Sequence, residues 1–566
     1  MDQKANMQNY SRGDVMAAFN SFSNIIDKND GLRNFSIQDN SCTDSDVPFA
    51  AGTQTHLKIT NTNHDINQIG ESFITAKVKL TGHFGKTYSA TTDDATTGAL
   101  KPNCLKFFIG FKNAAEIVRQ LEVENNNVDT DYLQTDCIRE SFAYHTYRSK
   151  SSKNIRKFSH SLYSNVHNYD NSVCGTYVDP TTFTAGTDKD IEFKISFDVN
   201  DLLGLECFQD WPRFMGDIVL KMIMDKSAVV WCQVDPKKVS DLNTLIYETM
   251  NDDQNGLIQN LNPLYDHKFA QAGNKLKVIK TCAYNIATAG STSGTVTFPT
   301  PSSITFTLDD DTFTCTSLTV TELKCSSYGY KVNPSIMKEL TTLFNPSNPF
   351  IIPAEFVDRK KFSQGTDGQG IDTDFSYALH NCTDAILAFP KDSISITCYE
   401  NPMLRNLQLA IDGKLYPVKS IETVGERFFN MALTASNLDE KDECTEEYED
   451  SLTRPLNSDS GTRFARTWKD QTSFIPPIQL ERNGNGFFFD GIETGNENVK
   501  VRLTATPMFT GANDTYYIPD STAPTVHPPC PEVWFNRDVY WTVDIQNGLK
   551  FHKTGTPPQY DNIWKN

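Results

Sequence analysis

Alternation of apolar and polar residues dominates the chain from about residue 46 onward. The stretch Ile-Glu-Phe-Lys-Ile-Ser-Phe-Asp-Val at 191–199 alternates throughout, which predicts a half-buried antiparallel strand with its odd-numbered residues inward. Similar runs occupy residues 73–80, 218–224, 304–308, 499–505 and 539–545. Strands separated by long polar loops, with few crossover helices, predict an all-β fold of two sandwiches in series rather than a parallel α/β fold.

Helical periodicity is confined to three short segments. Residues 11–30 combine a capping box, Ser11 with Asp14, and an apolar face on Val15, Phe19, Phe22 and Ile26. A second helix is expected at 240–250. A third should begin at Asn333-Pro334, because proline is favoured in the first turn after an asparagine cap.

The segment 405–418 predicts a β-hairpin. Asp412-Gly413 tolerates positive φ at both centres of a type I′ turn, which sets Leu409 opposite Tyr416 and Leu407 opposite Val418. Pro417 has no N–H to donate, so the second strand is expected to be an edge strand or to end there.

Four regions follow from these patterns. We expect an N-terminal arm with the amphipathic helix at 1–45, a first sandwich at 46–270, a second at 271–550 and a C-terminal tail at 551–566. The boundary between the sandwiches is placed within 235–300, where a polar tract and a Gly/Ser/Thr-rich tract occur. No internal repeat is evident from spacing.

Composition fits a large, water-soluble protein. The chain has 566 residues, of which 38% are hydrophobic, and its net charge of −19 argues against wholesale binding of a polyanion. No apolar run reaches the ~20 residues of a membrane span, and the start lacks the features of a signal peptide, so synthesis in the cytosol is expected. Thirteen cysteines occur without any Cys-x-x-Cys pair, which predicts buried reduced thiols.

Enzyme signatures are missing from the sequence. It contains no phosphate-binding loop, no His-Glu-x-x-His and no Gly-x-Ser-x-Gly, and its ten histidines are dispersed. We therefore predict a non-enzymatic protein with no catalytic residue, no bound cofactor and no metal ligand.

Three charged segments have both a functional and a plain interpretation. Residues 439–450 contain eight acidic residues, which could form a cation site. Residues 148–157 contain five basic residues, which could contact a phosphate or a partner. For both segments an exposed loop is the favoured interpretation. Arg12-Gly13-Asp14 spells an adhesion tripeptide but falls at the predicted helix start, which favours capping.

Ordered segments in the second half carry a family resemblance. They are Asp384-Ala-Ile-Leu-Ala-Phe-Pro390, Asn401-Pro402, Gly413-Lys-Leu-Tyr-Pro417, Phe428-Phe429, Phe474-Ile-Pro-Pro-Ile-Gln-Leu480, Phe487-Phe-Phe-Asp-Gly491 and Val499-Lys-Val-Arg-Leu503. In this order they resemble the double-jelly-roll major capsid proteins of virophages, Polintons and adintoviruses. The first half is similar more loosely, through Phe108-Ile-Gly-Phe-Lys-Asn-Ala114 and Leu203-Gly-Leu-Glu-Cys-Phe208.

The resemblance implies a fold and a role. Two jelly rolls would stand side by side, and three copies would form a pseudo-hexagonal, hexon-like homotrimer that tiles an icosahedral shell around double-stranded DNA. Neighbouring capsomers, penton and minor capsid proteins would be its partners in the virion, assembled in the host cytoplasm or nucleus. The amphipathic segment 15–26 would lie on the capsid underside.

Other proteins remain compatible with the residues. They are a single-jelly-roll capsid protein with an extra β domain, a carbohydrate-binding or glycoside-hydrolysing β-sandwich, and a host-attachment spike. Trp534 and Trp541 could offer an aromatic platform for sugars, although the alternating strand around Trp541 favours a core position.

Overall fold

The computed structural model describes the sheets and the segments next to them. The described residues are 35–41, 49–50, 52–60, 64–85, 87, 106–111, 114–135, 171–172, 175–199, 202, 205, 208, 210–224, 229–234, 271–272, 275–286, 301–332, 334–344, 346, 349–363, 370–389, 404–423, 426, 453–455, 463–465, 477–481, 489–495, 497–507 and 531–555. The helices expected at 11–30 and 240–250, the two charged loops and Arg12-Gly13-Asp14 lie outside these residues.

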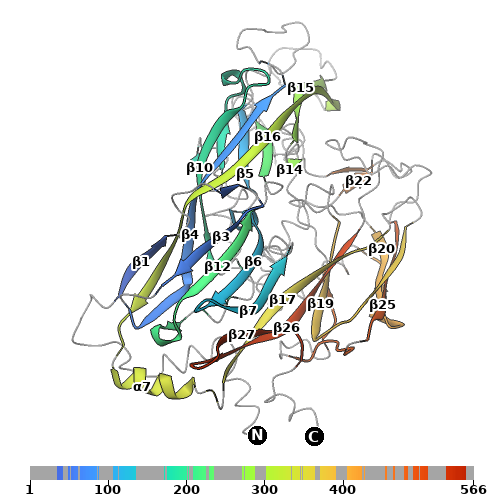
Figure 1. The fold of residues 1–566 in the computed structure, drawn as a ribbon. Helices are drawn as coiled ribbons and strands as arrows, with labels where there is room; N and C mark the ends of the chain where they lie inside the picture. Colours follow the sequence, from blue (N-terminus) through green and yellow to red (C-terminus); the bar gives the residue numbers. More distant parts are fainter. Residues whose placement is uncertain are drawn as a thin grey trace, which may run out of the picture.

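Two β-sandwiches lie side by side (Figure 1). In the first, one sheet has the order β1-β16-β4-β10, with β2 and β15 on β16 and β11 on β4, and the facing sheet has the order β3-β12-β6-β7. A further sheet has the order β14-β13-β5-β9-β8. The bounds of these strands are as follows: β1 Phe35–Ser41, β2 Phe49–Ala50, β3 Gln54–Ile59, β4 Ile66–Phe84, β5 Lys106–Phe111, β6 Val118–Asn125, β7 Val128–Thr135, β8 Asn171–Ser172, β9 Gly175–Val178, β10 Lys189–Asp198, β11 Trp211–Pro212, β12 Ile218–Met224, β13 Val229–Val234, β14 Gln271–Ala272, β15 Lys275–Ile286 and β16 Pro301–Tyr330.

The second sandwich has one five-stranded and one four-stranded antiparallel sheet. Their orders are β17-β26-β19-β24, with β27 on β26, and β18-β25-β20-β21. The bounds are β17 Phe350–Lys361, β18 Ile371–Tyr377, β19 Cys382–Ala388, β20 Leu404–Ile411, β21 Lys414–Ile421, β24 Pro477–Gln479, β25 Val499–Pro507, β26 Glu532–Asp544 and β27 Gly548–His552. Leaving β27 aside and numbering the eight strands along the chain gives 1-8-3-6 and 2-7-4-5, the order of a jelly roll.

The remaining described elements are short. A two-stranded sheet joins β22 (Thr453–Pro455) to β23 (Arg463–Ala465), and α7 (Pro334–Leu343) connects the sandwiches. The 3-10 turns are η3 (Ala114–Ile117), η5 (Pro180–Thr182) and η8 (Arg213–Met215). The predicted all-β fold of two sandwiches with few helices is therefore confirmed, as is the helix expected to begin at Pro334.

Alternation in the sequence matches burial in the structure. Ile191, Phe193, Ile195, Phe197 and Val199 are all buried, while the residues between them are exposed or half-buried. The other predicted strands lie within β4, β12, β16, β25 and β26, apart from Ile545, which follows the end of β26. Among the cysteines whose side chains the structure describes, Cys315, Cys325 and Cys382 are buried free thiols, in agreement with the prediction.

The passage between the sandwiches comes later than the expected boundary at 270/271. Strands β15 and β16 extend the sheet of β4, with Leu318 opposite Leu80 and Val320 opposite Val78. The boundary predicted from chain order was too early because β16, the last long strand of the first sandwich, pairs with β4, a strand from the beginning of the chain. Similarly, β1 lies within the expected arm and β27 reaches His552, inside the expected tail.

The hairpin 404–421 is confirmed in its turn and corrected in its register. Asp412 and Gly413 have φ values of 49° and 75°, and Leu409 pairs with Tyr416. Leu407, however, pairs with Ile421, because four residues of β21 stand against Gln408. The Gln408 Nε2 donates to the carbonyls of Pro417 at 3.0 Å and Val418 at 3.3 Å, so a side chain replaces the missing ladder bonds. As predicted, β21 is an edge strand.

Candidate functional site

Aromatic rings and hydrogen bonds join the two sandwiches along one surface. We call it the seam; it joins β7 of the first sandwich to β17, β26 and β27 of the second. Tyr132 lies at its centre, stacked on Trp541 with a centroid distance of 5.3 Å and in edge contact with Phe551 at 4.9 Å and Phe356 at 6.0 Å. Phe208 adds a tilted contact to Trp541 at 6.0 Å. One continuous apolar core thus runs from the first sandwich into the second.

Alternation in β7 explains how the seam forms. Thr130, Tyr132 and Gln134 are buried on the inward face, whereas Asp129, Asp131, Leu133 and Thr135 are exposed. The Gln134 Nε2 donates to the backbone carbonyl of Val357 at 3.2 Å, a direct hydrogen bond from the first sandwich to β17. Burying rings of this size supplies most of the energy of such a contact, while the hydrogen bond fixes its register.

A buried asparagine, Asn125, forms hydrogen bonds with both sandwiches at the edge of the seam, and we call this contact the clip. Asn125, which is 2% exposed, donates through Nδ2 to the carbonyls of Met215 (3.0 Å) and Asp217 (3.1 Å). Its Oδ1 accepts the N–H of Leu549, in the other sandwich, at 3.2 Å. Gly548 has a φ of 73°, and a Cβ at this position would stand 2.6 Å from Asn125 Oδ1. The side chain therefore sets the approach of the β26–β27 turn to the first sandwich.

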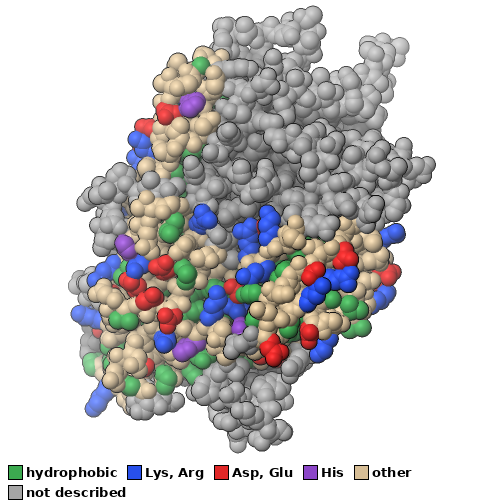
Figure 2. Space-filling view, turned by 45° about the vertical axis from the view of Figure 1, so that its right-hand side comes forward, with side chains coloured by type: hydrophobic (Ala, Val, Ile, Leu, Met, Phe, Trp, Pro, Cys, Tyr) green, Lys and Arg blue, Asp and Glu red, His purple; other side chains and the backbone are tan. Residues whose placement is uncertain are grey.

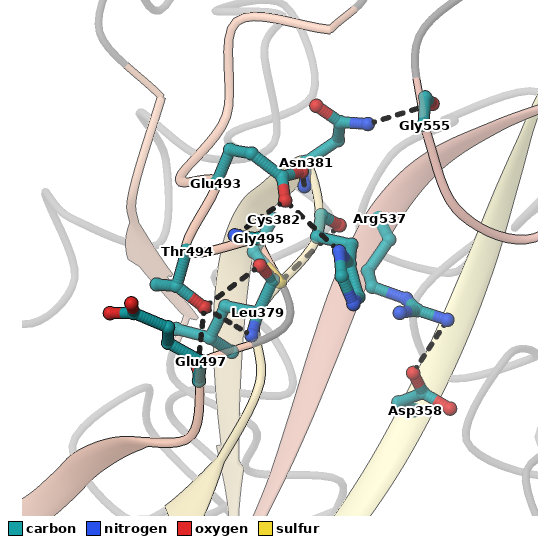
Figure 3. Close-up of polar contacts among 11 residues, drawn as sticks. Asp358, Leu379, Asn381, Cys382, Glu493, Thr494, Gly495, Glu497, Arg537 and Gly555 are labelled. Atoms are coloured by element: carbon teal, nitrogen blue, oxygen red, sulfur yellow. Dashed lines mark hydrogen bonds and ion pairs between the residues drawn. The ribbon is translucent and has the colours of Figure 1, made fainter.

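A buried ion pair lies where the seam meets the core of the second sandwich (Figure 3). Arg537, with a 2% exposed side chain, lies 2.8 Å through Nη2 from Oδ2 of Asp358. Asp358 also accepts a hydrogen bond from the Tyr377 hydroxyl at 2.8 Å and lies 3.4 Å from Lys553 Nζ. Phe356 lies beneath both cations, with Lys553 Nζ 4.4 Å and Arg537 Cζ 5.7 Å from its ring centroid. The donors around this half-buried carboxylate offset the loss of its contacts with water.

Two neighbouring groups have pKa values raised by the same environment. Burial, followed by the charge of Asp358, raises the pKa of the Tyr377 hydroxyl. Burial also raises the pKa of the Cys382 thiol, against the opposing effect of Arg537. Both groups therefore stay protonated at neutral pH, and Cys382 has none of the thiolate character that nucleophilic catalysis requires.

A second set of polar contacts holds the backbone just before β19, next to the ion pair. Glu493 accepts the backbone N–H of Asn381 and lies 3.0 Å from His380 Nδ1, and Thr494 Oγ1 accepts the N–H of Leu379 at 3.0 Å (Figure 3). Asn381, in a left-handed conformation with φ 46°, donates to the carbonyl of Gly555 at 3.2 Å. The segment after β27 therefore contacts both the start of β19, through Gly555, and the ion pair, through Lys553.

The sequence contains a signal for this site, a run of polar residues inside an apolar strand, that the search for apolar alternation did not detect. Asn536-Arg537-Asp538 interrupts an otherwise apolar strand, and all three residues are buried. Buried charged residues in such a strand are expected to be paired, as Glu532 at the start of β26 is with Arg359 through contacts of 2.6 and 2.8 Å. The pairing partner, Asp358, comes from a strand almost 180 residues earlier, so sequence alone could not name it.

The described surface offers little support for the alternative binding functions. Trp534 and Trp541 are each 0% exposed, so this pair provides no platform for sugars, and the core position favoured for Trp541 is confirmed. On the face shown in Figure 2, basic and acidic side chains are interspersed over the described surface. Within the described ranges, no group of three or more His, Cys, Asp or Glu could hold a metal ion, and no helix is long and apolar enough to cross a membrane.

Comparisons with known proteins give likenesses in structure. No family model and no curated protein sequence matches the chain. The mavirus major capsid protein aligns over 94% of this chain and 92% of its own, with 8% identity and a TM-score of 0.42. A chain of the Sputnik virophage aligns over 93% and 90%, with 10% identity and a TM-score of 0.43. The Faustovirus major capsid protein aligns over 89% and 90%, with 7% identity and a TM-score of 0.37.

The mavirus and Faustovirus proteins are major capsid proteins. In this chain, segments that carry the sequence resemblance come together in the second sandwich: 384–390 contributes most of β19, 474–480 contains β24, and 499–503 opens β25. β19 and β24 pair directly, with Ala385 opposite Ile478. The function proposed below rests on this chain's own sheets and residues.

Proposed function

We propose that this chain is a viral major capsid protein, a non-enzymatic building unit that assembles as pseudo-hexagonal homotrimers. The trimers would tile an icosahedral shell around a double-stranded DNA genome. Neighbouring capsomers, penton proteins and minor capsid proteins would be its partners, and the virion its location after synthesis in the host cytosol.

The observation that carries the proposal is the seam. A shell unit must keep a fixed outline, because small changes of angle within one unit accumulate over a closed surface. The stacked Tyr132 and Trp541, the Gln134 hydrogen bond and the Asn125 clip lock two sandwiches into one rigid body. A pair of sandwiches joined by a polar linker would instead move relative to each other.

The jelly-roll order of the second sandwich supports the same proposal. Sandwiches of this kind keep their strand edges short or covered, which suits a protein that must pack closely without uncontrolled aggregation. Four of the family segments, 384–390, 413–417, 474–480 and 499–503, overlap these strands, so for them the resemblance and the topology concern the same residues. By fold alone, many functions would be possible.

The test is the mass and shape of the purified full-length chain in solution. Light scattering after size exclusion should give three chains per particle, and negative-stain images should show triangular or hexagonal plates. A stable monomer, or a preparation that hydrolyses or binds polysaccharides, would overturn the proposal. Deleting residues 1–30, which include the amphipathic segment 15–26, should leave soluble trimers but impair shell formation; shells of normal yield would refute that part.

A further inference from the structure

Exposed large apolar side chains in the described molecule are concentrated on two strands. Of five such residues, Val128 (60% exposed) and Leu133 (44%) lie on β7, and Leu415 (46%) and Val418 (87%) lie on β21. These strands belong to different sandwiches, and each is the last strand of its sheet. Scattered surface leucines and valines are normal, but their pairing on two sheet edges is not.

On β7 the apolar residues accompany acids. Asp129 and Asp131 lie on the outward face together with Leu133, and Val128 opens the strand at the β6–β7 turn. The Asp131 carboxylate is 65% exposed, and it lies 3.7 Å from Lys550 Nζ. We call Val128, Asp129, Asp131 and Leu133 the acidic strip.

On β21 the apolar residues accompany bases. Lys414 and Leu415 are exposed beside the turn, and Val418 and Lys419 are exposed on the bulge. The Lys419 side chain is 74% exposed and lies 3.3 Å from Glu426, a surface pair that contributes little energy in water. We call Lys414, Leu415, Val418 and Lys419 the basic strip.

Protection of a free edge accounts for part of this pattern. Lysines, Pro417 and a bulge are devices that prevent a strand from pairing with another sheet. They do not account for Val418, because an edge that must stay in solvent gains nothing from a valine that is 87% exposed at the tip of its bulge. An apolar centre flanked by charges is instead the composition of a surface that becomes covered.

We propose that the basic strip of one copy docks on the acidic strip of a second copy. The two strips match in kind, each with two apolar and two charged residues, and they are opposite in sign. Because the contact uses two different surfaces of the same chain, it is head-to-tail, and a rotation that closes makes a ring of identical chains. The inference rests on the proposed function and supplies the contact within its trimer. Side chains carry the contact, since the bulge and Pro417 exclude a continued ladder.

Charge reversal tests the proposal in the full-length chain. K414E/K419E gives the molecule two acidic strips, and D129K/D131K gives it two basic ones. Like charges facing each other across an interface cost several kcal/mol, so each variant should associate on the order of 100-fold more weakly than the wild type. K194E/K324E is the matched control, since it changes two exposed lysines on β10 and β16 and should leave association unchanged. Mass by light scattering over a dilution series is the measurement, with circular dichroism to confirm folding.

The fourfold variant K414E/K419E/D129K/D131K distinguishes docking from damage to the fold. It reverses both strips, so attraction across the interface returns and trimers should reappear, although both local ion pairs are lost. Trimers that persist in either double variant, or a fourfold variant no better than the double ones, would overturn the docking while leaving the capsid proposal intact. A wild-type chain that is monomeric would instead refute the proposed function itself.

Discussion

The two sandwiches differ in how their cores are closed. The second has a core of its own, made of residues from both of its sheets, among them Leu409, Leu503 and Phe535. The core of the first sandwich continues past β7 to Phe356 and Trp541, which belong to the second. Strands of the second sandwich therefore cover one side of the first sandwich's core, whereas the core of the second sandwich is enclosed by its own strands.

One strand, β26, serves both cores. Val533 and Phe535 face the core of the second sandwich, and Val539 and Trp541 belong to the core that continues from the first. Arg537 occupies the inward position between these pairs, where its ion pair with Asp358 separates two apolar regions. A single strand with a buried charge at its middle thus couples two folding units, and single substitutions can separate their contributions.

Tyr132→Ala should have the largest effect. Removing a buried aromatic side chain costs about 3–5 kcal/mol, and here the loss falls on the wall shared by both sandwiches. Hydrogen exchange should accelerate in β6, β7 and β27 while β18, β20 and β25 remain protected. Leu409→Ala, in the core of the second sandwich, is the counterpart and should accelerate exchange in β18, β20 and β25. Equal acceleration in both sandwiches from Tyr132→Ala would mean that the second is not separately closed.

Arg537→Met tests the charge between the two cores. It removes the Arg537 partner of the Asp358 carboxylate, which is 13% exposed, and leaves the contacts with Tyr377 and Lys553, so a loss of about 3 kcal/mol of unfolding free energy is expected. Arg502→Met is the matched control within the same sandwich. Arg502 holds Asp372 in two contacts of 2.7 Å, but both side chains are about half exposed and screened by water, so the loss should be much smaller than for Arg537→Met. Denaturant unfolding measures both, and equal losses would contradict a special role for the buried pair.

Gly548→Ala tests the clip at the edge of the seam. The new Cβ would meet both a positive φ and the Asn125 Oδ1 at 2.6 Å, so a loss of about 2–3 kcal/mol is expected. Gly413→Ala is the control, because Gly413 has nearly the same φ, 75°, but nothing within 4 Å of the added Cβ. It should cost only the backbone strain, about 1 kcal/mol. The difference in stability between the two variants, measured by thermal unfolding, gives the contribution of the contact across the seam. Equal losses would show that this contact does not constrain Gly548.

Local patterns in the sequence predicted local structure well. Strict alternation at 191–199 and the Asp-Gly turn at 412–413 were sufficient because each depends on neighbouring residues: side-chain direction in one case, positive φ in the other. The register beyond the turn was wrong because the Gln408 amide satisfies carbonyls that an ideal ladder would pair. A long side chain that replaces backbone hydrogen bonds leaves no periodic signal.

Distant pairings were not predictable from spacing. Strand β16 pairs with β4 over a long sequence separation, 240 residues for Thr319 and Lys79, so chain order placed it in the wrong half. The ion pair at the seam has the same character, since Asp358 and Arg537 come from opposite ends of the second half. Burial of Trp534 and Trp541 followed from their apolar strand, but the Tyr132 partner of Trp541 comes from the first sandwich.

Acidification should weaken the second sandwich next to the seam, with the smallest effect of the four. Burial, followed by the charge of Lys550, lowers the pKa of His552 below the ordinary 6.5, and its ring stacks on Tyr540 at 4.6 Å. The folded state therefore holds this imidazole neutral while the unfolded chain binds the proton. Its contribution to stability is complete above pH 6.5 and is lost as the pH falls from 6.5 through the folded pKa. His552→Gln keeps a polar group beside Thr542 but cannot titrate, so the slope of unfolding free energy against pH should flatten below 6.5. His64, whose pKa is also lowered by burial, should leave a residual slope in the first sandwich. An unchanged slope in His552→Gln would show that this ring does not sense pH.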